Sequence, residues 1–143
     1  MAYYNKIGLL IINDRQTKFL VCVPGKAYGE KQVRQYLIPG GQIEKDESDQ
    51  ECLAREIKEE LACDIDKNSL KFVGEYTDLA ASGYGRDVTI KLYQGKLIGE
   101  PKPSSEIGQL RWIGKETMND EENNSPIVRN KIIPDLLNRA ILK

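Results

Sequence analysis

The chain has 143 residues, of which 40% are hydrophobic and 30% are charged, and its formal net charge is −1. This composition is typical of a soluble globular protein, and we expect one domain, residues 1–143, that buries its own core. The near-zero net charge gives no electrostatic basis for coating nucleic acid or a membrane surface, so we expect no stable complex with either. Any anionic ligand must then be bound locally, by a few basic groups or by a metal ion.

The sequence contains no histidine, and its cysteines are Cys22, Cys52 and Cys63, without a Cys-x-x-Cys pair. The missing histidine excludes imidazole zinc sites, Ser-His-Asp triads and Cys-His dyads. Acid–base chemistry must therefore use carboxylates, Lys, Tyr or metal-bound water. The cysteines lie in apolar contexts, which indicates reduced core thiols of a cytoplasmic protein. The apolar run at the N-terminus is too short for a signal peptide or a membrane-spanning helix.

Short runs rich in β-branched and aromatic residues predict the strands, which in chain order are 7–12, 19–23, 34–38, 70–77, 87–93 and 109–113. The polar residues 13–16, between the first two runs, predict a hairpin turn. Pro39 should end the third strand, because proline donates no hydrogen bond to a sheet. Gly40 and Gly41 then predict a turn with positive φ.

Helices are expected at about 48–61 and about 126–142. Ser48 and Glu51 have the spacing of a capping box at the start of the first helix. Ser125 and Pro126 predict an N-cap followed by proline at the first helical position of the C-terminal helix, which Pro134 should kink or divide. Mostly adjacent strands, interrupted by one helix and closed by another, predict an α+β sheet covered by helices.

The first predicted helix carries an acidic cluster in its second half, namely Glu56, Glu59 and Glu60. Glu56 and Glu60 are one turn apart, and like charges at this spacing destabilise a helix by about 0.2–0.5 kcal/mol. The later acids also approach the negative end of the helix dipole. A divalent cation would reverse this argument, because carboxylates at one-turn spacing are suitable ligands for Mg²⁺. From the spacing alone, a metal site and a solvated acidic face both stay open.

Gly41, Glu47 and the run Arg55-Glu56-Ile57-Lys58-Glu59-Glu60-Leu61 follow a recognisable spacing. The stretch resembles the Nudix box, G-x5-E-x7-R-E-U-x-E-E-x-G-U, in which U is a bulky aliphatic residue. The strands before and after it also resemble the Nudix order, so the likeness covers nearly the whole chain. By this resemblance, the fold would be a Nudix-type α/β/α sandwich with a mixed β-sheet, and residues 48–61 would form its catalytic helix.

The resemblance implies hydrolysis of a nucleoside diphosphate linked to another moiety, with Mg²⁺ or Mn²⁺ as the cofactor. Matched position by position, the metal ligands would be the Gly40 carbonyl, Glu56, Glu59 and Glu60. Glu47 would lie near the metal cluster, and Arg55 would orient the glutamates through a salt bridge. Glu56 is also the best single candidate for the base that activates water.

Outside the box, the resemblance extends to MutT-type members of the family. Glu106 precedes Trp112 by six residues and would be a second metal ligand or a base, with a solvated loop acid as the alternative. Asn124 lies two residues before a proline and would read the nucleotide base, although an Asn before a Ser-Pro cap also has a purely structural explanation. Tyr36 occupies the position of an aromatic beside the nucleoside. Trp112 is expected in the core or the pocket wall, with a stacking platform as the alternative.

The sequence also departs from the family pattern. Ala62 replaces the last glycine of the box, so we expect either a left-handed residue, strained by about 1 kcal/mol, or a helix that continues past it. Val23-Pro24 occupies the strand end where MutT-type members have phosphate-binding arginines. Triphosphate recognition would then need other cations, namely Lys26, Lys31, Arg34 or Arg86.

Together these patterns predict a metal-dependent Nudix pyrophosphohydrolase that converts a nucleoside triphosphate, ordinary or oxidised, to a monophosphate and pyrophosphate. The alternatives are a nucleotide-sugar or dinucleoside-polyphosphate hydrolase, and a Nudix-fold module that binds a nucleotide without cleaving it. The intact acidic set argues against a pure binding module. We expect Tyr36, Arg34 and Asn124 to bind the nucleotide, and the sequence permits a homodimer.

Overall fold

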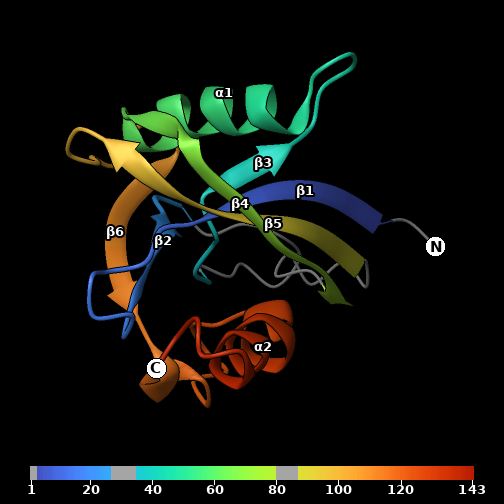
Figure 1. The fold of residues 1–143 in the computed structure, drawn as a ribbon. Coiled ribbons are helices and arrows are strands. Elements are labelled where there is room, and N and C mark those ends of the chain that lie inside the picture. The colour runs from blue at the N-terminus through green and yellow to red at the C-terminus, as the bar shows by residue number, and fades with distance from the viewer. Residues whose placement is uncertain (1–2, 27–34, 80–86) are drawn as a thin grey trace.

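The computed structural model describes residues 3–26, 35–79 and 87–143 (Figure 1). Its strands are β1 (Tyr3–Leu10), β2 (Phe19–Pro24), β3 (Gly40–Gln42), β4 (Asp64–Leu79), β5 (Asp87–Ile98) and β6 (Ile107–Ile113). Its helices are α1 (Asp49–Leu61) and α2 (Ile133–Asn138), with a 3-10 turn, η1 (Lys115–Thr117), and a π-helical segment, η2 (Val128–Ile132), between β6 and α2. No helix among the described residues is long and apolar enough to cross a membrane.

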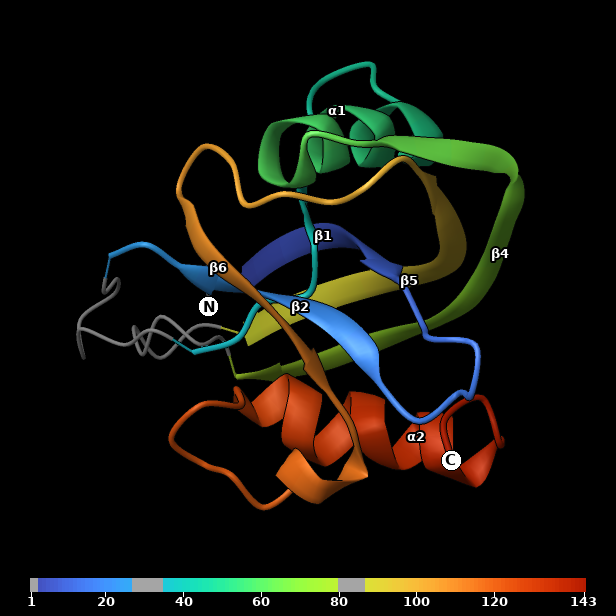
Figure 2. The ribbon, with the colours of Figure 1, turned by 90° about the vertical axis from the view of Figure 1, so that its left-hand side faces the viewer.

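The strands form two sheets, a four-stranded sheet in the order β3-β1-β5-β4 and a two-stranded sheet of β2 and β6. The larger sheet is mixed, because β1 pairs with β5 in parallel and with β3 in antiparallel fashion. Figures 1 and 2 show α1 on one side of the strands and α2 on the other. This layering confirms the predicted α/β/α sandwich with a mixed sheet.

Two buried clusters attach the helices to the strands. The buried residues of α1 are Cys52, Leu53, Ile57 and Leu61. On the other side, the buried residues of the C-terminal helical stretch include Ile127, Val128, Ile132, Ile133 and Leu136. Each large apolar side chain removed from water contributes about 1.5–3 kcal/mol, so one apolar face is enough to hold α1 in place. Its other face is left for the acidic residues.

Both ends of α1 have identifiable caps. The Ser48 hydroxyl accepts a hydrogen bond from the Glu51 N–H at 3.1 Å, and the Glu51 carboxylate accepts one from the Ser48 N–H at 2.9 Å. These bonds confirm the predicted capping box. Ala62 has a φ of 53°, and its N–H donates to the Lys58 carbonyl. Of the two endings considered, the left-handed one is therefore observed, at a cost of about 1 kcal/mol.

The prediction of a strand over 34–38 followed by a glycine turn is wrong. Among its described residues, Tyr36 and Leu37 make only isolated bridges, and the regular strand is β3, which contains both glycines. Gly40 has the expected positive φ, 143°, but it pairs with Gly8 of β1 in the sheet. A Cβ at Gly40 would collide with the Ile7 carbonyl oxygen, so glycine is needed for the close approach of two strands and not for a turn.

The predicted hairpin of the first two strands forms only at its turn end, where the Asn13 and Leu20 N–H groups donate to the Lys18 and Ile11 carbonyls at 2.9 Å. The Asn13 side-chain carbonyl accepts hydrogen bonds from the Thr17 and Lys18 N–H groups at 2.8 and 2.9 Å. One isolated antiparallel bridge joins Ile12 to Phe19. Beyond this bridge the strands separate, and β1 enters the larger sheet while β2 pairs with β6. The polar turn residues therefore predict a local chain reversal, but they do not predict which strand each neighbouring strand pairs with.

The C-terminal helical stretch begins at Pro126, as predicted, but α2 ends at Asn138 and not near residue 142. Ala140 takes a left-handed φ of 56°, which is incompatible with a continuing helix. Pro134 lies in the first turn of α2, directly after the π-helical segment η2. Because proline lacks an N–H and crowds the preceding turn, the predicted division takes the form of a change from π to α geometry.

Candidate metal and nucleotide site

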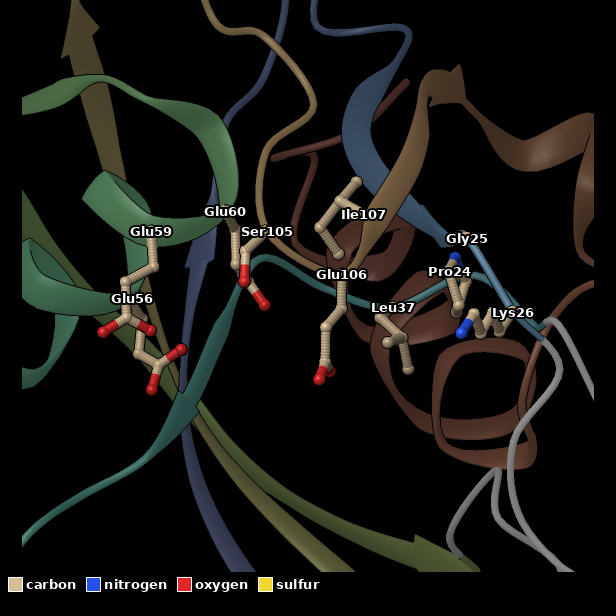
Figure 3. A pocket seen from close by; sticks show the side chains of 10 residues that line it. All are labelled: Pro24, Gly25, Lys26, Leu37, Glu56, Glu59, Glu60, Ser105, Glu106 and Ile107. Atoms are coloured by element: carbon tan, nitrogen blue, oxygen red, sulfur yellow. The ribbon is translucent and has the colours of Figure 1, made fainter.

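A cavity of about 950 Å³ lies between the second half of α1, the end of β2 and the loop before β6 (Figure 3). Its lining residues are Pro24, Gly25, Lys26, Leu37, Glu56, Glu59, Glu60, Ser105, Glu106 and Ile107. The acidic cluster of α1 and Glu106, which are far apart in the sequence, thus face the same space. Leu37, Ser105 and Ile107 were not expected there, because their position depends on the pairing of β2 with β6, which no local pattern reports.

Glu60 is half-buried at the edge of this cavity. Its carboxylate accepts a hydrogen bond from the Gly40 N–H at 2.9 Å. Burial raises the pKa of Glu60 to about 7, and the hydrogen bond from Gly40 and the charge of Lys6 act in the opposite direction. Arg55 forms ion pairs with Glu56 and Glu59, and none with Glu60 is found among the described residues. A cation bound in the cavity would balance the Glu60 charge.

Glu56 lies against the backbone of Gly41. A Cβ at Gly41 would lie 2.6 Å from each carboxylate oxygen of Glu56, so any larger residue here would displace this carboxylate. On its other side, Glu56 accepts a hydrogen bond from the Arg55 guanidinium at 2.6 Å. The glycine of β3 and the arginine of α1 therefore fix the orientation of this carboxylate toward the cavity.

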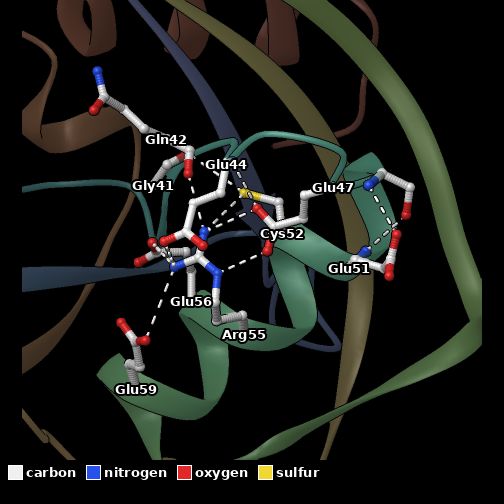
Figure 4. Close-up of polar contacts among 10 residues, drawn as sticks. Gly41, Gln42, Glu44, Glu47, Glu51, Cys52, Arg55, Glu56 and Glu59 are labelled. Carbon is white, nitrogen blue, oxygen red and sulfur yellow. Dashed lines mark hydrogen bonds and ion pairs between the residues drawn. The ribbon is translucent and has the colours of Figure 1, made fainter.

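Arg55 joins the loop before α1 to the acidic cluster (Figure 4). Its Nε and Nη2 donate to the two carboxylate oxygens of Glu47 at 2.7 and 3.0 Å, and Nη2 also donates to the Gln42 carbonyl at 3.1 Å. Its Nη1 lies 3.9 Å from a Glu59 oxygen. The hydrogen bond from Arg55 lowers the pKa of Glu47 to about 2. In this arrangement Glu47 holds Arg55 and does not line the cavity.

Glu106 reaches the cavity from the wall opposite α1 (Figure 3). Its backbone carbonyl accepts a hydrogen bond from the Gly25 N–H at 2.8 Å, which fixes the loop before β6 against the end of β2. Trp112, by contrast, is 46% exposed on β6, and it does not line the cavity. The expectation that Trp112 lies in the core or the pocket wall is wrong.

Tyr36 and Asn124, both expected to bind the nucleoside, lie side by side. They form an isolated parallel bridge, and the Tyr36 N–H donates to the Asn123 carbonyl at 2.7 Å. Asn124 is fully buried, and its Nδ2 donates to the Thr117 carbonyl at 2.6 Å. Its Oδ1 has no partner within the described ranges. A buried acceptor without a partner costs about 1–3 kcal/mol, so this oxygen is suited to a ligand donor.

Neither Tyr36 nor Asn124 lines the cavity of Figure 3, but Leu37, the neighbour of Tyr36, does. The pair therefore lies behind one end of the cavity. Arg34, the third residue expected to bind the nucleotide, lies outside the described residues, as do Lys31 and Arg86.

The donor set of the cavity fits a hard divalent cation. Carboxylates of Glu56, Glu59, Glu60 and Glu106 face one space, and oxygen ligands of this kind are preferred by Mg²⁺ and Mn²⁺. Within the part of the chain that the structure describes, no three acidic or thiol side chains are close enough together to hold an ion by themselves. Mg²⁺ usually keeps waters and binds substrate phosphates, so a few carboxylates from this wall are sufficient.

The NUDIX domain family matches the chain over residues 3–136. The MutT protein from Methanosarcina mazei Go1 has a similar structure, with 20% identity and a TM-score of 0.72 over 96% of this chain and 95% of that one. The E. coli ORF135 protein is similar at 19% identity and a TM-score of 0.71, over 98% and 93% of the two chains. A UDP-X diphosphatase is similar at 18% identity and a TM-score of 0.67, over 97% and 63%. No curated protein matches the chain.

Proposed function

Because the chain belongs to the Nudix family and is a hydrolase acting on phosphoanhydride bonds, we propose that its substrate is a nucleoside triphosphate, ordinary or oxidised. The products would be a nucleoside monophosphate and pyrophosphate. The observation that carries this proposal is the presence of Glu56, Glu59, Glu60 and Glu106 on one cavity of about 950 Å³. A cavity of this size is in the range that small-molecule ligands occupy.

The proposed metal ligands are Glu56, Glu59 and Glu60 with the Gly40 carbonyl, and Glu106 from the opposite wall. Bound Mg²⁺ or Mn²⁺ would supply positive charge to the phosphoryl oxygens as the bond to the leaving group breaks. Glu56 is the proposed base, because Gly41 and Arg55 hold its carboxylate in one orientation. Arg55 is a positioning residue in this scheme, and Glu47 fixes the plane of its guanidinium.

Tyr36 and Asn124 are the proposed nucleoside contacts. The Nδ2 of Asn124 donates one of its two N–H bonds to the Thr117 carbonyl, whereas its buried Oδ1 has no hydrogen-bond partner among the described residues, so Oδ1 is the Asn124 atom that most needs a ligand donor. The base would therefore present an N–H donor to Asn124. Arg34 stays a predicted nucleotide contact from the sequence alone.

A nucleotide panel tests the substrate class. The panel contains the common ribo- and deoxyribonucleoside triphosphates, 8-oxo-dGTP, a UDP-sugar and a dinucleoside tetraphosphate, each with Mg²⁺ or Mn²⁺. The expected result is a higher kcat/KM for a triphosphate, with pyrophosphate among the separated products. Because a UDP-X diphosphatase is among the similar structures, the UDP-sugar is the main alternative substrate in the panel. A preference for the UDP-sugar, with UMP as a product, would contradict the proposal.

A further inference from the structure

The cavity has an acidic wall and, away from it, one cation. Lys26 is the only lysine or arginine in its described lining, which also contains the carboxylates of Glu56, Glu59, Glu60 and Glu106. In Figure 3, Glu106 and Leu37 are drawn between the α1 carboxylates and Lys26. None of the ion pairs found among the described residues involves Lys26. Its ammonium group is therefore available to an anionic ligand.

The backbone fixes the place from which Lys26 extends. The preceding residue, Gly25, donates its N–H to the Glu106 carbonyl at 2.8 Å. A Cβ on Gly108 would lie 2.8 Å from the Gly25 Cα, so the two backbone segments are in contact here with no side chain between them. The pairing of β2 with β6 also shifts its register between Val23 and Pro24. Lys26 thus directly follows Gly25, whose backbone is held against the loop that carries Glu106.

A nucleotide in this cavity meets different surroundings at the two ends. The α1 carboxylates repel phosphate unless a metal ion lies between them, whereas an ammonium group binds phosphate directly. Leu37 lines the cavity and is bridged to Cys22 of β2, and the next residue toward the N-terminus is Tyr36, which is bridged to Asn124. The end of the cavity away from α1 therefore adjoins the proposed nucleoside contacts.

We propose that Lys26 binds the phosphate nearest to the nucleoside, the one that remains in the monophosphate product. The inference rests on the proposed function, since it places a nucleotide in this cavity with its nucleoside toward Tyr36 and Asn124. It assigns Lys26 a role that needs no metal ion. Lys26 is consequently expected to bind the product nucleotide even when divalent cations are removed.

Metal-free binding tests this role of Lys26. The whole chain is titrated in EDTA with GMP and guanosine, and with UMP and uridine, by isothermal calorimetry. For the wild type, at least one monophosphate is expected to bind about tenfold more tightly than its nucleoside. Lys26→Met should remove this difference and leave nucleoside affinity unchanged, whereas Lys26→Arg should retain most of it. Lys67→Met, an exposed lysine of β4 outside the cavity lining, is the matched control.

The outcomes separate the inference from the proposed function. Equal monophosphate affinity in the wild type and Lys26→Met, or no metal-free monophosphate binding by the wild type, overturns the role of Lys26. Either result leaves the function intact if the wild type still hydrolyses triphosphates with Mg²⁺. Monophosphate binding that depends on Lys26, in a wild type that cleaves none of the triphosphates, supports Lys26 and overturns the proposed triphosphate substrate. Unchanged melting temperatures of the variants exclude loss of fold as the cause.

Discussion

Glu56 and Glu60 lie one turn apart on α1, yet different groups face their charges. Glu56 receives a hydrogen bond from the cationic Arg55 at 2.6 Å, whereas Glu60 receives one from the neutral Gly40 N–H at 2.9 Å. Burial, which disfavours the charged form, raises the pKa of Glu60. Glu60 is therefore the carboxylate of α1 with the greatest need for an added cation.

Replacing Glu60 by Gln is expected to lower kcat by at least about 100-fold at saturating Mg²⁺, because a neutral amide is a weaker ligand than a carboxylate. The fold should survive, since Gln can still accept the hydrogen bond from Gly40. Steady-state kinetics and thermal melts measure both effects, with Glu75→Gln, an exposed acid of β4, as the control. An unchanged kcat would show that Glu60 is not one of the proposed metal ligands.

Gly41→Ala tests the close contact between β3 and the Glu56 carboxylate. The added methyl group would occupy space 2.6 Å from the Glu56 oxygens, so the carboxylate must move. Misplacing a catalytic group by about 1 Å costs on the order of 100-fold, and a fall in kcat of about 10- to 100-fold is expected. Gln42→Ala is the neighbouring control, because it keeps the backbone carbonyl that Arg55 uses. Wild-type kcat in Gly41→Ala would show that Glu56 is not held by this contact.

At the scale of elements, a polar cluster of three side chains attaches α2 to β4. The Tyr76 hydroxyl donates to the Asp135 carboxylate at 2.5 Å, and the Arg139 guanidinium donates to the same oxygen at 3.0 Å. Arg139 also donates to the Val73 carbonyl of β4 at 2.8 Å. The hydrogen bond from Tyr76 lowers the pKa of Asp135 below its ordinary value, because it stabilises the charged form.

Asp135→Asn is expected to lower the free energy of unfolding by about 1 kcal/mol at pH 7. The expected loss is small because the side chains of the cluster are partly exposed. A lowered folded-state pKa means that the contribution is complete above the ordinary Asp value, about 3.9, and is lost as the pH falls through the folded value. Denaturant unfolding from pH 7 to pH 2.5 should therefore show the two proteins converging at the acidic end. A difference independent of pH would assign the effect to packing and not to charge.

Local patterns were enough to predict α1 and its N-terminal capping box, since Ser48 and Glu51 act within a few residues of themselves, whereas two endings stayed open at Ala62. A salt bridge from Arg55 to the glutamates was also predicted, from the family resemblance, although Glu47 was not named as its partner. The separation of β2 from β1 was not predicted, because strand partners depend on the burial of distant segments. The exposure of Trp112 was not predicted for the same reason, because which face of β6 is buried depends on the distant segments that pack against it.

For the whole molecule, metal binding and stability are linked. The clustered carboxylates of α1 repel one another without a cation, and an ion that binds only the folded state stabilises it in proportion to RT ln(1 + [L]/Kd). Millimolar Mg²⁺ or Mn²⁺ is therefore expected to raise the melting temperature, and Glu60→Gln should reduce the rise. Thermal melts across a series of Mg²⁺ concentrations measure this rise in melting temperature. Ca²⁺-free NaCl solutions of equal ionic strength are the control. The same melting temperature throughout would indicate no metal binding to the free protein.

The division of the strands into two sheets has a mechanical consequence for the cavity. The wall formed by α1 is tied to the larger sheet, for example through the hydrogen bond from Tyr93 of β5 to Asp49. Lys26 and Glu106 instead belong to the β2–β6 pair and its loops. The width of the cavity thus depends on how the β2–β6 pair is placed relative to the larger sheet and α1. Backbone hydrogen bonds join the two sides at their edges, for example from the Ser104 N–H to the Glu60 carbonyl at 3.0 Å. Apolar packing, such as that of Leu20 and Leu53, fills the space between them, so a distant core substitution can change the cavity width and the reaction rate.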